Sequence, residues 1–118
     1  MAFHTSLPIY KVAFDLLSIV TDFTANYPRQ FRLIGNRVHT ACLEIVLLIA
    51  KANAAREKSQ HLVALLDRNG ELELLLRLSV DKRWISKSHY AKAIDLTQSV
   101  GRQANGWKGK SYEPSPAV

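Results

Sequence analysis

A chain of 118 residues is long enough for one domain with a hydrophobic core, and too short for two such domains. Hydrophobic residues make up 47% of the chain and charged residues 22%, a balance typical of globular proteins. The five Gly and four Pro are few for an all-β protein, which needs many turns, so the composition favours helices.

The chain is basic, with a net charge of +6 at pH 7 and a pI of about 9.7. Such a surplus permits a polyanionic partner but does not require one. The first residues lack the basic-then-apolar pattern of a secretory signal. No uninterrupted apolar run approaches the roughly 20 residues that span a bilayer. We therefore expect a soluble, cytoplasmic protein with no membrane partner.

The clearest predicted helix covers residues 8–25. Pro8 suits the first turn of a helix, where its missing N–H would be unsatisfied anyway. Apolar side chains recur along one face at helical spacing, and polar side chains occupy the other. The apolar stripe consists of Ile9, Val12, Ala13, Leu16, Ile19, Val20 and Phe23. Pro28 then interrupts the chain.

A second helix is predicted over residues 30–55. One face carries a core stripe, but a second face is also apolar, so residues 45–50 are apolar all round. A helix that is apolar on every side needs burial on every side. In so short a chain we expect another subunit to cover the second face, and a central place in a monomeric bundle is the alternative. The candidate oligomer interface consists of Leu43, Val46, Leu47 and Ala50.

Residues 61–78 allow two incompatible interpretations. Asn69-Gly70 is a strong hairpin signal, and the leucines after it alternate like one face of a strand. The same leucines also fit helical spacing, and the segment is rich in leucine and poor in β-branched residues. An isolated two-stranded hairpin is marginally stable, and the neighbouring segments are predicted helices. We therefore predict a third helix over residues 57–83, with Gly70 as the point where it would kink.

The last predicted helix starts at Ser86 or Ser88, either of which can act as an N-cap. Residues 111–118 have no apolar periodicity and carry two prolines, which is typical of a mobile tail. The sequence therefore predicts an all-α, antiparallel four-helix bundle over residues 1–110, followed by a tail over residues 111–118.

Few residues form the pattern of a catalytic or metal-binding site. The predicted helices lack the paired Glu-x-x-His motifs of di-iron bundles, and the glycines match no phosphate-binding loop. His39 and Cys42 have a spacing that could share a metal, but no third ligand is evident. Cys42 lies in an apolar run, where a free cysteine usually acts as a small buried hydrophobe. We expect no enzyme activity, no metal and no cofactor.

Basic residues are the remaining functional signal. They crowd the second helix with its ends, and the chain from the end of the third helix onward, with Tyr27, Trp84, Trp107 and Tyr112 nearby. Mixtures of basic and aromatic side chains can hold phosphates and stack bases. A solvated helix surface is the alternative for each basic residue. The candidate nucleic-acid-binding residues are Arg29, Arg32, Arg37, Lys51, Arg56, Lys58, Arg77, Lys82, Arg83, Arg102 and Lys108.

Four segments resemble, in order and spacing, the accessory variability determinant (Avd) proteins of diversity-generating retroelements. They are LPIYKVAFDLLSIVTDF, YPRQFRLIGNRV, ELLLRLSVDKRWISKSHYAKAIDL and VGRQANGWKGK, which together span residues 7–110. The resemblance implies a four-helix bundle assembled into a pentameric, barrel-like ring. It also implies binding of nucleic acid and of the retroelement reverse transcriptase, so that the protein assists mutagenic cDNA synthesis without being a catalyst.

The positions that match the family pattern are Arg29, Arg37, Arg77, Arg83, Arg102, Trp107 and Lys108. Arg77 has a structural alternative, because Glu73 and Asp81 lie four residues to either side of it on a helix surface. Trp107 has one as well, as a packing anchor. The chain departs from the pattern at Asn69-Gly70 and at residues 103–105, which are more polar than the resemblance implies.

Two functions remain for the structure to weigh. The first is a non-catalytic accessory homo-oligomer that binds a reverse transcriptase, and RNA or DNA with low sequence specificity. The alternative is a structural homo-oligomer, similar to the bundle proteins encoded in ribosomal RNA intervening sequences, that acts through a protein partner only. Four arginines distinguish the two functions: Arg37, Arg56, Arg83 and Arg102. Their clustering on one exposed face would favour the first function, and their pairing with acidic side chains would favour the second.

Overall fold

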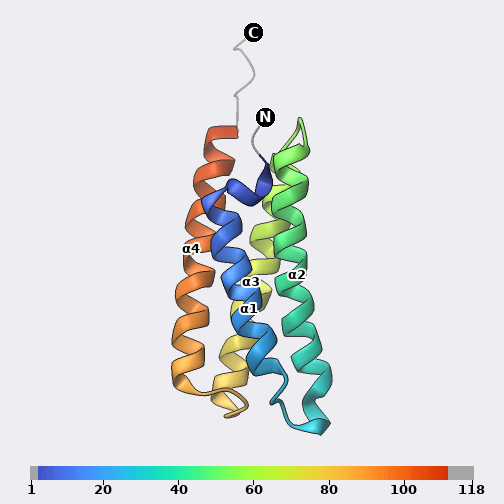
Figure 1. Cartoon of the computed structure of the whole chain (residues 1–118), viewed down its shortest axis with the longest axis vertical. Coiled ribbons are helices and arrows are strands. Elements are labelled where there is room, and N and C mark those ends of the chain that lie inside the picture. Colours follow the sequence, from blue (N-terminus) through green and yellow to red (C-terminus); the bar gives the residue numbers. More distant parts are fainter. Residues whose placement is uncertain (1–2, 112–118) are drawn as a thin grey trace.

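The computed structural model describes residues 3–111, and this part of the chain contains four α-helices and no strand (Figure 1). The helices are α1 (Pro8–Thr24), α2 (Arg32–Ala54), α3 (Ser59–Asp81) and α4 (Lys87–Ser111). Short 3-10 turns precede α1 and α2, as η1 (His4–Ser6) and η2 (Arg29–Phe31). Successive helices run in opposite directions, and α4 packs against both α3 and α1. The predicted antiparallel four-helix bundle is therefore confirmed for the described residues. Ser111, which was expected in the tail, is the last residue of α4, and the rest of the predicted tail, residues 112–118, lies outside the described residues.

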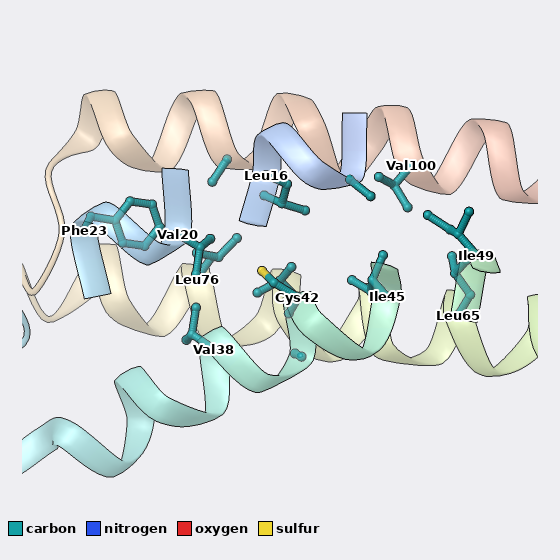
Figure 2. Packing of buried hydrophobic residues seen from close by; sticks show 14 of the residues in the cluster. Leu16, Val20, Phe23, Val38, Cys42, Ile45, Ile49, Leu65, Leu76 and Val100 are labelled. Carbon is teal, nitrogen blue, oxygen red and sulfur yellow. The ribbon is translucent and has the colours of Figure 1, made fainter. Parts of the chain in front are cut away.

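The core is built from the inward face of each helix. Figure 2 shows Leu16 and Val20 from α1 meeting Ile45 from α2, Leu76 from α3 and Val100 from α4, and each is fully buried. These positions recur every three to four residues, as the helical period requires. Burying a side chain of this size stabilises the fold by about 1.5–3 kcal/mol. The stripe predicted for α1 contains all five buried residues of this helix, namely Ile9, Ala13, Leu16, Val20 and Phe23, while Val12 and Ile19 are half-buried.

The expectation that no segment is long and apolar enough to span a membrane was wrong for α2 and the turn before it. The segment Arg29–Ala54 contains an 18-residue window of mean hydropathy 1.5, long and apolar enough by length and composition to cross a membrane. The expectation rested on uninterrupted apolar runs. An average over 18 residues can be high even where small or weakly polar residues interrupt such a run. In the bundle this apolar character serves packing, since Val38, Ile45 and Ile49 are fully buried and α2 contacts both α1 and α3.

The ambiguous Asn69-Gly70 pair lies inside α3, which continues from Ser59 to Asp81. Asn69 is buried, and its Nδ2 donates a hydrogen bond to the carbonyl of Thr97 in α4 at 2.9 Å. Gly70 is exposed, and nothing lies within 4 Å of the position a Cβ would take. The hairpin interpretation is therefore wrong and the helical one is confirmed.

The α3–α4 connection closes with a defined turn. Arg83 has φ of 64°, its N–H donates to the carbonyl of Val80 at 3.0 Å, and the N–H of Trp84 donates to that of Ser79 at 2.9 Å. This pair of bonds is a Schellman motif. Ser86 then caps α4, because its Oγ accepts a hydrogen bond from the N–H of His89 at 3.0 Å. Of the two predicted caps, the structure uses Ser86.

Tyr27 fastens the α1–α2 connection to the same end of the bundle. It is buried, and its hydroxyl donates to Ser79 Oγ in α3 at 2.6 Å. Gly35 of α2 makes room for the ring, since a Cβ there would lie 3.2 Å from Tyr27 Cγ. The α1–α2 and α3–α4 connections thus lie together at the lower end of Figure 1.

Candidate nucleic-acid and oligomer surfaces

Basic side chains gather at the end of the bundle that holds these two connections. We call this surface the basic end and define it by Arg29, Arg32, Lys82, Arg83 and Lys87, all of which are exposed. None of the five forms an ion pair with another residue of the described chain. The only acidic residue in segments 25–33 and 80–88 is Asp81, which pairs with Arg77. The basic end is therefore a concentration of uncompensated positive charge.

Three aromatic rings lie within the basic end. The ring centroid of Trp84 is 4.4 Å from that of Phe31 and 5.8 Å from that of Tyr27. Trp84 is half-buried, and Phe31 remains 36% exposed. Trp84 thus packs against both neighbouring rings at the end of α3, while Phe31 stays partly open to solvent.

Two of the predicted nucleic-acid-binding arginines are already paired. Arg37 Nε lies 2.7 Å from Glu71 Oε2, and Arg37 Nη2 donates to Glu71 Oε1 at 2.9 Å. Arg77 Nε lies 3.1 Å from Asp81 Oδ2, and hydrogen bonding by this carboxylate raises the pKa of Arg77. Both arginines still expose much of their side chains, so these surface pairs add little stability.

Part of the structural interpretation of Arg77 needs correction. Glu73 was expected to share this arginine, but its Oε2 instead accepts a hydrogen bond from Thr97 Oγ1 in α4 at 2.8 Å. Glu73 therefore faces the neighbouring helix, which the spacing along α3 alone could not indicate.

Lys58 caps the C-terminal end of α2. Its Nζ donates to the carbonyls of Ala52, Asn53 and Ala55 at 2.8, 3.2 and 2.9 Å. These groups lie at the C-terminal end of α2, where carbonyls lack helical partners and a positive charge is favourable. All three ammonium hydrogens are engaged, so Lys58 is a poor candidate for contacting phosphate.

The remaining candidates do not form one cluster. Lys51, Arg56 and Arg102 are exposed and Lys108 is half-buried, and none has an ion-pair partner among residues 3–111. Arg56 lies in the α2–α3 connection, at the opposite end from Arg83 (Figure 1). The four discriminating arginines are thus spread over the bundle, with only Arg37 paired. The sequence-based list missed Lys87, although it closes the run KRWISK that contains Lys82 and Arg83.

The predicted oligomer interface lies on the outer face of α2. Leu43 and Leu47 are 40% and 57% exposed, and Val46 and Ala50 are half-buried. Phe14 of α1 is 51% exposed and was not predicted.

Phe14 extends this apolar face onto α1. Thr21 of α1 hydrogen-bonds to His39 of α2 at 3.0 Å, and Phe14 and Val46 each lie seven residues from that contact. Because the helices are antiparallel, Phe14 and Val46 lie at the same height. The stacking of Phe14 on Tyr10, with ring centroids 6.0 Å apart, fits an outward aromatic strip that the spacing of these residues could have suggested.

A second apolar area lies beside the Arg37–Glu71 pair. Leu33 of α2 is 82% exposed and Leu74 of α3 is 70% exposed. Leu33 lies one turn before Arg37 and Leu74 lies about one turn after Glu71, so the antiparallel helices carry both leucines toward the basic end. The sequence gave no sign of this area, because the apolar spacing of α2 and α3 does not distinguish Leu33 and Leu74 from leucines of the core.

The structure also places Cys42 and Trp107, and it tests for grouped metal ligands. Cys42 is buried, as predicted, and burial raises the pKa of its thiol to about 12. Among residues 3–111 no three His, Cys, Asp or Glu side chains are grouped to hold a metal ion. Trp107 is half-buried against the core, which agrees with the packing alternative for this residue.

Comparison with known proteins agrees with the motif resemblance. The family described as bAvd-like matches residues 9–111, which include all four helices almost in full. A search of curated proteins gave no match. Because the family match covers most of the chain, in the order and fold that the motifs imply, this protein belongs to the bAvd-like family.

Proposed function

We propose that this protein is a non-catalytic accessory factor of a diversity-generating retroelement, which binds the reverse transcriptase and its RNA or cDNA. The family match over residues 9–111 supports an Avd-type accessory role. The observation that carries nucleic-acid binding is the basic end, where five exposed cations have no ion-pair partner within the described chain. Cations free of acidic partners are available to phosphates at no loss of internal pairing.

The binding would be electrostatic and weakly specific. Each neutralised phosphate releases condensed counterions, so affinity falls steeply as salt rises. No base-reading motif is present in the sequence, and backbone contacts position a protein without selecting a sequence. An accessory factor with these properties could hold a template and its cDNA near a polymerase whatever their sequence.

We further propose a cytoplasmic homo-oligomer, a pentameric ring, formed through the face of Phe14, Leu43 and Leu47. Exposed apolar areas of this kind mark interaction sites, because water contact with them is unfavourable. The area around Leu33 and Leu74 is then left for the polymerase, on another flank of the bundle. The charged pair Arg37–Glu71 borders it, as polar groups border many protein interfaces.

The first experiment is binding of the purified protein to a structured RNA across a salt series, with light scattering to give the mass. We expect Kd to rise about 100-fold or more between roughly 50 and 200 mM salt, because five phosphate contacts give a logarithmic salt slope of about −3.5 to −4.5. A matched pair of variants separates the two apolar areas. Leu47→Asp should give a monomer, and Leu74→Asp should stay oligomeric but lose co-purification with the reverse transcriptase.

The alternative function, a structural oligomer with a protein partner only, is favoured by the pairing of Arg37 with Glu71 and of Arg77 with Asp81. It predicts no RNA binding at any salt concentration, together with an intact oligomer. That result would refute direct nucleic-acid contact.

A further inference from the structure

The basic end contains an arginine in a backbone conformation that suits glycine. Arg83 has φ of 64° at the residue that follows the α3 C-cap, and helices that end in this way usually carry glycine there. Its side chain is exposed and makes no hydrogen bond or ion pair with residues 3–111. The side chain therefore contributes nothing evident to folding that would offset the strained backbone.

Arg83 borders a surface hollow of about 680 Å³. The hollow lies in the α3–α4 connection and is lined by Val80, Asp81, Arg83, Trp84, Ile85, Ser86 and Lys87. Arg83 and Lys87 supply two cations to this lining, and its one acidic residue, Asp81, forms an ion pair with Arg77. Trp84 supplies an aromatic wall, and Phe31 extends that wall at a centroid distance of 4.4 Å.

We propose that this hollow binds an unpaired nucleotide of single-stranded RNA or DNA. The base would lie against Trp84 and Phe31, and its phosphates would contact Arg83 and Lys87. This inference rests on the proposed function and deepens it by naming the binding site and the class of nucleic acid.

The unpaired state follows from the chemistry of the wall. Both faces of a base inside a duplex are covered by neighbouring base pairs, so only an unstacked base can lie on an aromatic side chain. Arg29, Arg32 and Lys82 lie at the same end of the bundle, in or beside the α1–α2 and α3–α4 connections, and are exposed to contact the neighbouring phosphates. If all five cations of the basic end each neutralise one phosphate, the logarithmic salt slope for a single strand is about −3.5.

Intrinsic fluorescence can report this site alone. The chain has two tryptophans, so a Trp107→Phe background leaves Trp84 as the single emitter. We would titrate this protein with an oligouridylate of roughly 12 nucleotides, a length typical of single-strand sites, and with the same strand annealed to its complement. We expect quenching of Trp84 by the single strand, with at least about tenfold tighter binding than for the duplex, as the stacking of one base provides.

Arg83→Gly is the decisive variant, because glycine suits the backbone at this residue. We expect Tm to stay unchanged or rise. The Kd for the single strand should rise about fivefold or more, and the salt slope should become shallower by about 0.7, the value of one phosphate contact. Arg56→Gly is the matched control, since it removes an equally exposed and unpaired arginine from the connection at the opposite end. It should leave the quenching titration unchanged.

Each contrary result points to one assumption. Equal weakening by Arg83→Gly and Arg56→Gly would show general attraction and overturn the site. Equal affinity for strand and duplex would overturn the unpaired base, and equal quenching by poly-glutamate would overturn the nucleotide. If RNA binds in the salt series but Trp84 does not respond, this inference fails while the proposed function stands. If no RNA binds at all, both fail.

Discussion

The cap formed by Lys58 gives a quantitative test of the fold. Lys58→Met keeps the length and the apolar stem of the side chain but removes the ammonium group that donates to the carbonyls of Ala52, Asn53 and Ala55. In the variant these carbonyls would have to turn to water. Since Lys58 is only half-buried, water can reach them, and the loss will be smaller than for three fully buried bonds.

The magnitude can be bounded from two sides. A hydrogen bond to a charged group contributes about 1.5–3 kcal/mol where both groups are buried. A cation at an exposed helix C-terminus contributes about 0.3–1 kcal/mol, and up to about 2 kcal/mol when partly buried. Lys58 belongs to the second class, near its upper limit, because one ammonium serves three carbonyls. We expect Lys58→Met to lower the free energy of unfolding by about 1.5 kcal/mol.

Urea denaturation followed by circular dichroism measures this loss. With an m-value of about 1.5 kcal/mol/M, the midpoint should fall by about 1 M. Lys51→Met is the control, because Lys51 is an exposed cation in the last turn of α2 with no ion-pair partner in the described chain, and its loss should cost no more than about 0.3–1 kcal/mol. A midpoint for Lys58→Met equal to the wild type, or an equal loss at Lys51, would refute the cap.

Three further predictions concern other parts of the bundle. Gly70→Ala should raise the free energy of unfolding by about 1 kcal/mol, because Gly70 is inside α3 and a Cβ there meets nothing within 4 Å; an unchanged urea midpoint would contradict this. Gly35→Ala should instead lower it by roughly 1 kcal/mol, since its Cβ would lie 3.2–3.4 Å from the ring of Tyr27, which the bond to Ser79 holds in place; a higher midpoint than the wild type would show that the ring can move. The thiol of Cys42, with its pKa raised to about 12, should react with a disulfide reagent at pH 8 more than about 100-fold slower in the folded protein than in urea, and rapid native labelling would show that α2 opens locally.

The raised pKa of Cys42 also sets a pH dependence of stability. In the unfolded chain the thiol ionises near its ordinary pKa of 9.0, whereas in the bundle it stays protonated up to about 12. Its contribution to stability is therefore complete below pH 9 and is lost as pH rises toward 12, at up to about 1.4 kcal/mol per pH unit. A Cys42→Ala variant, measured by urea denaturation from neutral to alkaline pH, should lose stability less steeply than the wild type above pH 9; identical slopes would contradict this.

The sequence by itself determined the four helices, most of their bounds and buried faces, and a capping serine before α4, which it left open between Ser86 and Ser88. These features depend on local periodicity and on residues near a helix end, so the chain reveals them without its partners. The sequence also predicted that Cys42 is buried and that α2 has a second apolar face. In the structure Leu43 and Leu47 of this face are exposed. At Asn69-Gly70 the local signals conflicted, and the surface offered by the neighbouring helices decided for α3.

Only the tertiary structure decided which charges are free. Arg37 is 34 residues from its partner Glu71, and Glu73 bonds to Thr97 24 residues away, so no spacing rule could assign either contact. The same holds for the basic end, which the antiparallel packing assembles from the α1–α2 and α3–α4 connections. Helices follow from interactions a few residues apart, whereas ion pairs and surfaces follow from which helix ends meet, and that is fixed only when the core is packed.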